Sequence, residues 1–125
     1  MPIAEYRLQA GKRGEDLACA ELRRLGYAIL ARRYRSRFGE IDLIGEHDNA
    51  VVFIEVKARK SGRRGTAAES ITWRKRRKIA AMALDYLSYT HKLERRCRFD
   101  VVAIDGYGTA RMTLRVIRDA FQVER

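Results

Sequence analysis

Four ionisable side chains interrupt two apolar runs between Gly39 and Lys57. Glu40 and Asp42 fall in the first run, and Glu55 and Lys57 fall in the second. A short polar stretch separates the runs, which is the pattern of two β-strands joined as a hairpin. Residues two apart on a strand share a face, so each ionisable pair projects from one side of the hairpin.

The turn sets the register that we expect for this hairpin. If it closes symmetrically about Asp48-Asn49, then Asp42 faces Glu55 and Glu40 faces Lys57. Directly opposed residues have Cβ atoms about 4.5–5.5 Å apart. Two carboxylates at that distance repel each other in a partly buried site, and a hard cation such as Mg²⁺ or Mn²⁺ removes the conflict. We therefore predict a metal site at Asp42 and Glu55.

The simpler alternative is that the four residues are ordinary solvent-facing charges on an amphipathic hairpin. It accounts for Glu40 and Lys57, which would form a cross-strand pair that contributes about 0.2–1 kcal/mol. It accounts poorly for Asp42 opposite Glu55, because like charges directly opposed destabilise a sheet. The acidic pair therefore favours the metal site.

The spacing of these residues resembles a known signature. Asp42, followed after twelve residues by Glu55-Val56-Lys57, resembles the D…(D/E)-x-K pattern of the PD-(D/E)XK, or restriction-endonuclease-like, nuclease superfamily. Ile41 stands where the superfamily name has proline, which is not a metal ligand. The wider pattern resembles the uncharacterised YraN-like proteins of that superfamily. Its matching segments are GKRGEDLA, LGYAIL-x-R-x-YR, FGEIDLI, VFIEVKAR, IT-x-RK-x-RK and RFDVVAI.

The resemblance implies a Mg²⁺-dependent endonuclease that hydrolyses nucleic-acid phosphodiesters. The similarity of the family to Holliday-junction resolvases suggests branched DNA as the substrate. The Val56 carbonyl would be a further metal ligand, and Lys57 would orient the attacking water. Glu15, on the first helix, matches a glutamate that joins the active site in resolvase-like members; the alternative is that it only complements the helix dipole. Glu40 is a secondary candidate for a second metal or for water positioning.

Hydrophobic periodicity places the other elements and predicts one domain over residues 1–125, with its core at about 11–118. The order of helix, three strands, helix and two strands fits an α/β restriction-endonuclease-like three-layer sandwich, in which helices flank a central mixed β-sheet. A loop at about 58–68 is expected to be mobile without substrate. Besides the hairpin, we expect helices at 12–25 and 72–89 and strands at 27–35, 97–104 and 109–117.

The charge balance predicts a polyanionic partner. The chain has 27 Lys+Arg against 16 Asp+Glu, a net charge of +11. An anionic membrane surface would also attract it, but no long amphipathic membrane helix is present, so we expect nucleic acid, DNA rather than RNA, and no membrane partner. Ten basic residues and one acidic residue lie between positions 57 and 78. The basic residues expected to bind nucleic acid are Arg63, Arg64, Arg74, Lys75, Arg76, Arg77 and Lys78.

A solvated helix face is the alternative for the basic run, but five consecutive cations repel one another and disfavour a helix N-terminus. Lys75 is four residues before Ile79 and is expected to point inward, while Arg76 and Arg77 face outward. Trp73 fits either the core or a stack on a base. A phosphate partner explains the run better than solvation does.

The remaining signals are weaker. Neither Cys19 nor Cys97 has metal-ligand spacing, and the chain shows no signal peptide, so we expect reduced thiols and a cytoplasmic location. His47 and His91 are expected at the surface, and Asp100 is expected to pair with a nearby arginine. A homodimer is left open. A non-catalytic DNA- or RNA-binding module on the same fold, including a ribosome-associated one, is the alternative to a nuclease.

Overall fold

Seven elements follow one another in the predicted order. The structure is a computed structural model, and it describes residues 3–59 and 71–122. The first helix begins at Ile3, about nine residues before the predicted start, because Gly11 and Gly14 lie inside it and obscured its early turns. The elements are α1 (Ile3–Arg24), β1 (Ala28–Ser36), β2 (Gly39–His47), β3 (Ala50–Arg59), α2 (Trp73–Tyr89), β4 (Arg96–Asp105) and β5 (Thr113–Ile117).

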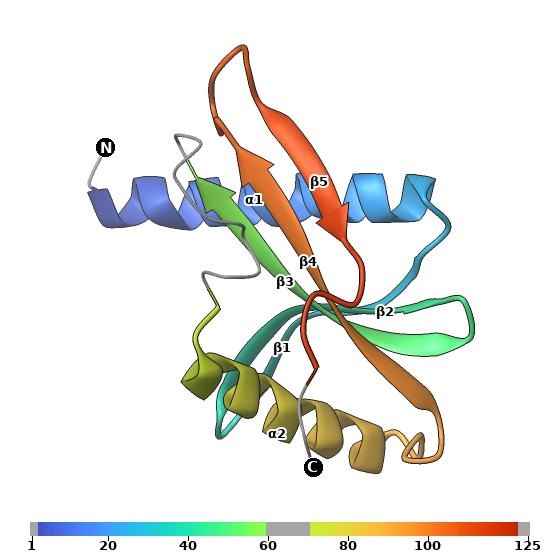
Figure 1. Ribbon diagram of the computed structural model, residues 1–125. Helices are drawn as coiled ribbons and strands as arrows, with labels where there is room; N and C mark the ends of the chain where they lie inside the picture. The colour runs from blue at the N-terminus through green and yellow to red at the C-terminus, as the bar shows by residue number, and fades with distance from the viewer. Residues whose placement is uncertain (1–2, 60–70, 123–125) are drawn as a thin grey trace.

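The five strands form one mixed sheet between the two helices (Figure 1). The strand order is β1-β2-β3-β4-β5, with β3 and β4 parallel and the other neighbours antiparallel. The parallel pair follows from the crossover through α2, which returns the chain to the same end of the sheet. The predicted α/β three-layer sandwich with a central mixed sheet is confirmed.

Each helix buries an apolar stripe against its own face of the sheet. Ala18 and Leu22 of α1 pack in one core cluster with Leu43 and Ile54 of the hairpin. The stripe of α2 packs in a second cluster on the other face of the sheet; its buried residues are Ile79, Met82, Ala83, Tyr86 and Leu87. Within the described residues, neither helix is both long enough and apolar enough to cross a membrane.

The predicted loop falls mostly outside the part that the structure describes. Residues 58 and 59 are not loop but the end of β3, where they pair with Ile104 and Asp105 of β4. Residues 60–68, which include Arg63 and Arg64, lie outside the described residues.

The hairpin closes as its turn residues predicted. Asp48 and Asn49 have φ values of 49° and 66°, the left-handed conformation that a two-residue hairpin turn requires and that these residue types tolerate. The resulting ladder runs from His47 opposite Ala50 to Leu43 opposite Ile54. Over this stretch the predicted register is confirmed.

Gly45 lies where β2 passes closest to β1. A Cβ atom at this position would lie 2.8 Å from the carbonyl oxygen of Ala28, which is backbone and not free to turn aside. We expect Gly45→Ala to lower the free energy of unfolding by roughly 1–3 kcal/mol, because the two strands must separate. Urea denaturation measures the change.

Gly14 is the matched control for this substitution. Its added Cβ would meet the Ala58 Cβ at 3.7 Å and the Ile104 Cδ1 at 3.8 Å, which is ordinary van der Waals contact inside a helix. Gly14→Ala should therefore raise the free energy of unfolding by about 0.5–1 kcal/mol. Equal destabilisation by both substitutions would contradict the close approach at Gly45.

A buried polar network joins residues of several elements, including His47 beside the hairpin turn. Asp100 is fully buried and accepts hydrogen bonds from Tyr27, Arg98 and the backbone of Asp119. The expected pairing of Asp100 with an arginine is confirmed. The expectation that His47 is a surface residue is wrong: it is 9% exposed, stacks on Tyr27 with ring centroids 4.1 Å apart, and lies 3.0 Å from Arg98 through Nδ1.

Candidate active site

The acidic residues of the hairpin lie where β2 separates from β3. The backbone ladder ends at Leu43 and Ile54, one residue before Asp42 would face Glu55. Beyond this point the Val56 amide donates a 2.7 Å hydrogen bond to the Asp42 carboxylate instead of to a strand partner. The Asp42 side chain thus takes the place of a backbone partner at the point where the β2–β3 ladder ends.

The second half of the predicted register is wrong. Glu40 does not face Lys57, because the β2–β3 ladder ends at Leu43 and Ile54, whereas β2 continues beside β1 as far as Gly39. Its strand partner is Arg35, which also donates a 3.1 Å hydrogen bond to its carboxylate. Glu40 is exposed and lies at the rim of the site rather than beside the other two carboxylates of the hairpin.

A third carboxylate comes from α1, as the resemblance implied. Glu15 is 6% exposed and Glu55 is 7% exposed. One oxygen of Glu15 accepts a 2.8 Å hydrogen bond from Arg33, whereas its Oε1 atom is buried without a hydrogen-bond partner among the described residues. Glu15 lies near enough to Asp42 to act on its charge, as Glu55 does.

The carboxylates act on one another electrostatically. Burial, followed by the negative charge of Glu55, raises the pKa of Asp42 from 3.8 to about 7, although the Val56 amide opposes the shift. Glu15 adds a smaller contribution in the same direction as Glu55. The site accordingly favours any added positive charge, whether a proton or a cation.

This raised pKa predicts how stability depends on pH when a chelator is present. Between about pH 4 and pH 7 the folded chain keeps a proton on Asp42 that the unfolded chain has lost, so the free energy of unfolding should fall as the pH rises through this range. Above the folded pKa the contribution becomes constant.

Asp42→Asn removes the titrating group and keeps its shape. The stability of this variant relative to wild type should increase from about pH 4 to pH 7, as followed by urea denaturation in EDTA. A constant difference across that range would mean that the Asp42 carboxyl titrates normally.

Two lysines adjoin the carboxylates. Lys57 follows Glu55 on the same face of β3, and burial followed by the charge of Lys75 lowers its pKa. Lys75, from the first turn of α2, forms an ion pair with Glu55 through its Nζ atom. The inward direction of Lys75 was predicted from its spacing to Ile79, but its contact with a candidate metal ligand was not.

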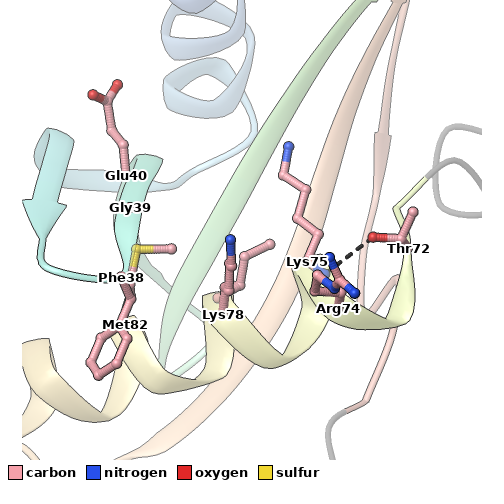
Figure 2. A pocket seen from close by; sticks show the side chains of 9 residues that line it. Phe38, Gly39, Glu40, Thr72, Arg74, Lys75, Lys78 and Met82 are labelled. Atoms are coloured by element: carbon pink, nitrogen blue, oxygen red, sulfur yellow. Dashed lines mark hydrogen bonds between the residues drawn. The ribbon is translucent and has the colours of Figure 1, made fainter.

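A cleft of about 350 Å³ opens beside this cluster, between the β1–β2 turn and the start of α2 (Figure 2). Arg74, Lys75 and Lys78 of the helix and Glu40 of β2 are among the residues that line it. Thr72 caps the helix at this end by accepting a hydrogen bond from the Lys75 amide at 3.2 Å. The remaining lining residues are Phe38, Gly39, Ile79 and Met82.

The sequence belongs to a recognised family. A profile described as Uncharacterised protein family UPF0102 matches residues 14–104. The chain belongs to the UPF0102 family. This match confirms the resemblance to the YraN-like proteins, and it spans every candidate site residue, from Glu15 on α1 to Lys78 on α2.

Similar UPF0102 proteins occur in distant bacteria. One from Rhodococcus opacus is 42% identical over 117 residues, which cover 93% of this chain and 98% of the relative. One from Nitrosococcus oceani is 44% identical over 115 residues, which cover 91% and 92% of the two chains. One from Symbiobacterium thermophilum is 41% identical over 113 residues, which cover 90% and 96%.

The basic residues of α2 do not form one uniform surface in this UPF0102 protein. Arg74 and Lys78, two of the residues predicted to bind nucleic acid, line the cleft. Arg77 is exposed and lies 4.8 Å from the ring of Trp73, whose 71% exposure excludes a core role. Arg76 was expected to face outward, but it donates to the Ile71 carbonyl and stacks on Phe121. The expectation for Arg76 is wrong because α2 turns this position toward the C-terminal segment.

Arg33 was missed as a partner of the site. It stands in the arginine-rich stretch RRYRSR, where nothing in the spacing sets it apart, yet it is the residue that holds Glu15. The backbone of β1 is irregular here: the register shifts between Ile29 and Ala31, and Arg33 has a φ of 52°. Strand periodicity carried no signal for that irregularity, and so the direction of Arg33 was not predictable from it.

The donor set suits a hard cation. Within residues 3–59 and 71–122, no three acidic, histidine or cysteine side chains lie close enough together to form a metal site as they stand. The Oε1 atom of Glu15, buried without a hydrogen-bond partner among the described residues, and the raised pKa of Asp42 nevertheless mark two carboxylates that would accept a cation. Carboxylate and carbonyl oxygens are the ligands that Mg²⁺ and Mn²⁺ prefer, so the residues fit such an ion once Glu55 is free of Lys75.

Proposed function

We propose that this UPF0102 protein is a metal-dependent endonuclease that hydrolyses phosphodiester bonds in nucleic acid. The observation that carries this proposal is the grouping of Asp42 and Glu55 with Lys57 where β2 leaves β3, near Glu15 and beside a cleft lined by cations. A carboxylate cluster alone would bind a cation, and a basic cleft alone would bind phosphate. Together they suit hydrolysis of a phosphate ester.

Asp42 and Glu55 would hold the ion, and the Val56 carbonyl would add a third oxygen. The N–H and C=O groups of one strand residue point to the same neighbouring strand, so the Val56 carbonyl also faces the side on which its amide meets Asp42. Mg²⁺ bound there would lower the pKa of its water and stabilise charge on the phosphate oxygens. Glu15, held by Arg33, is placed to orient a ligand from the α1 side.

Lys57 would orient the attacking water and offset the charge that develops on the phosphate. Burial and the neighbouring Lys75 lower its pKa, so that its ammonium releases a proton more readily than an exposed lysine does. Arg74 and Lys78 would hold adjacent phosphates of the strand in the cleft. Glu40, paired with Arg35 at the rim, remains a secondary candidate for positioning water.

DNA is the favoured substrate, and branched DNA is the form that the resemblance to resolvases implies. The direct test incubates the purified protein with labelled linear, branched and single-stranded DNA and with RNA, with Mg²⁺ or Mn²⁺ or with EDTA. Metal-dependent cleavage of one of these substrates supports the proposal. Binding without cleavage under every condition would favour the alternative, a non-catalytic nucleic-acid-binding module on the same fold.

Mn²⁺ or Mg²⁺ should raise the melting temperature of the wild-type protein, and Asp42→Asn should abolish the rise. A ligand that binds only the native state stabilises it by RT ln(1 + [L]/Kd), which is about 2.7 kcal/mol at a hundredfold excess over Kd. Differential scanning calorimetry with and without metal measures the effect.

Asp48→Asn is the matched control for this prediction. It removes one carboxylate from the hairpin turn, and asparagine tolerates the positive φ of that position. The control should respond to metal as the wild type does. Identical responses of wild type and Asp42→Asn would show that Asp42 is not a metal ligand.

A further inference from the structure

Lys75 belongs to two surroundings at once. It lines the cleft together with Arg74 and Lys78, and its ammonium group forms the ion pair with Glu55. In Figure 2 its side chain extends from α2 away from the helix axis, whereas Lys78 is one turn further along the cleft. One flexible side chain therefore connects the surface that would bind phosphate with a carboxylate that would bind metal.

The two members of this ion pair differ in freedom. The side chain of Lys75 is 41% exposed, whereas that of Glu55 is 8% exposed. Burial alone would lower the pKa of Lys75, but its hydrogen bond to Glu55 raises it. Lys75 is thus a charged group that solvent and a phosphate can reach, and its four-carbon stem lets it move between partners. Glu55 is fixed in β3 and does not follow it.

We propose that a phosphodiester of the nucleic-acid substrate, bound in the cleft, draws Lys75 away from Glu55 and so enables the metal to bind. This inference rests on the proposed function and adds a coupling between the binding of nucleic acid and the binding of metal. While Lys75 holds Glu55, a cation must displace an ammonium group to reach that carboxylate. A phosphate in the cleft offers Lys75 another anion, and Glu55 then becomes available beside Asp42.

Such coupling is reciprocal. A ligand that binds one arrangement of Lys75 better than the other shifts the equilibrium toward that arrangement, and each ligand then raises the affinity for the other by the same factor. Couplings of this kind are typically 5–150-fold. The metal would therefore bind weakly to the free protein and more tightly to the complex with nucleic acid, which restricts the assembled site to protein that holds substrate.

The test measures Mn²⁺ binding by titration calorimetry, without and with a saturating short single-stranded DNA oligonucleotide whose integrity is checked on a gel afterwards. Three proteins are compared: wild type, Lys75→Met and Lys78→Met. In wild type the oligonucleotide should tighten Mn²⁺ binding by about 5–150-fold. Lys75→Met should bind Mn²⁺ more tightly than wild type without DNA, and its gain from the oligonucleotide should shrink to a few-fold.

Lys78→Met is the matched control, because it removes the same charge from the same cleft without a contact to Glu55. It should bind DNA less tightly but keep the wild-type gain in Mn²⁺ affinity at saturating oligonucleotide. An equal gain in wild type and Lys75→Met would overturn the coupling while leaving the metal site intact. Absence of Mn²⁺ binding in all three proteins, with and without DNA, would overturn the proposed function as well.

Discussion

Lys57→Ala is expected to lower the rate of nucleic-acid cleavage by about 10²–10³-fold while binding remains nearly unchanged. A loss of this size is typical when a donor that stabilises charge developing in the transition state is removed. Lys57 lies on the same strand face as Glu55, and its pKa is lowered by burial and then by Lys75. A cation in such a position stabilises charge that appears only in the transition state, so its loss affects turnover more than affinity.

Lys78→Ala separates this effect from general electrostatics. Lys78 is exposed and lines the same cleft as Lys75, three residues further along α2. Its removal should weaken binding to all sequences and reduce the slope of log K against log[salt] by about one unit if it contacts one phosphate. Single-turnover cleavage and fluorescence anisotropy, measured over a salt series, give the two quantities. Equal loss of binding in both variants, without cleavage by wild type, would support the binding module.

The hairpin was predictable because local chemistry specifies it. Asp48 and Asn49 accept the left-handed backbone of a two-residue turn, and the turn fixes the register as far as Leu43 and Ile54. Hydrophobic periodicity likewise located α1 and α2, although α1 begins earlier than predicted. These features follow from residue type and periodicity alone, and they were sufficient to bring Asp42 and Glu55 to the same end of the hairpin.

The departure of β2 from β3 was not predictable in the same way. Simple register counting continued the ladder to Glu40 and Lys57, but the Asp42 side chain takes the Val56 amide and Glu40 pairs with Arg35. The choice depends on how β1 lies against β2, which is a tertiary property. Interruptions of regular strand pairing are over-represented next to active sites, where local sequence rules often fail.

The side chains that compensate the carboxylates also required the structure. Arg33 reaches Glu15 from an irregular strand, and Lys75 reaches Glu55 from another layer of the fold. Charge runs marked both residues as members of basic clusters, and the helical spacing of Lys75 gave its inward direction but not its partner. His47 was missed for the same reason, since its partners Tyr27 and Arg98 are distant in sequence.

Tyr27 and Arg98 contact the carboxylate of Asp100, which we expect to contribute most to the stability of the fold. The Asp100 carboxylate accepts from Arg98 at both oxygens, at 2.8 Å each, from the Tyr27 hydroxyl at 2.6 Å and from the Asp119 amide at 2.9 Å. Burial, followed by the hydrogen bond to Asp100, raises the pKa of Tyr27 to about 12, so the phenol remains a donor throughout the physiological range. The network ties β4 to the start of β1 and to the segment after β5.

Asp100→Ala should lower the free energy of unfolding by about 3–5 kcal/mol, a large share of the roughly 5–15 kcal/mol that a domain possesses. The substitution leaves Arg98, whose side chain is 16% exposed, without its carboxylate, and it removes the acceptor of the Tyr27 hydroxyl. Guanidinium denaturation followed by circular dichroism measures the loss. Asp100→Asn, which keeps the shape of the side chain and one acceptor, should lower the free energy of unfolding by less. It can be measured in place of the alanine variant if that variant does not fold.

Glu21→Ala supplies the control, because it removes a carboxylate from the ion pair with Arg24, whose side chain is 70% exposed. An exposed pair on a helix contributes little, and this variant should remain within about 0.5 kcal/mol of wild type. A similar small loss for Asp100→Ala would mean that the buried network merely offsets its own desolvation. The larger loss is expected because a guanidinium deprived of its buried partner retains the desolvation penalty without the compensating hydrogen bonds.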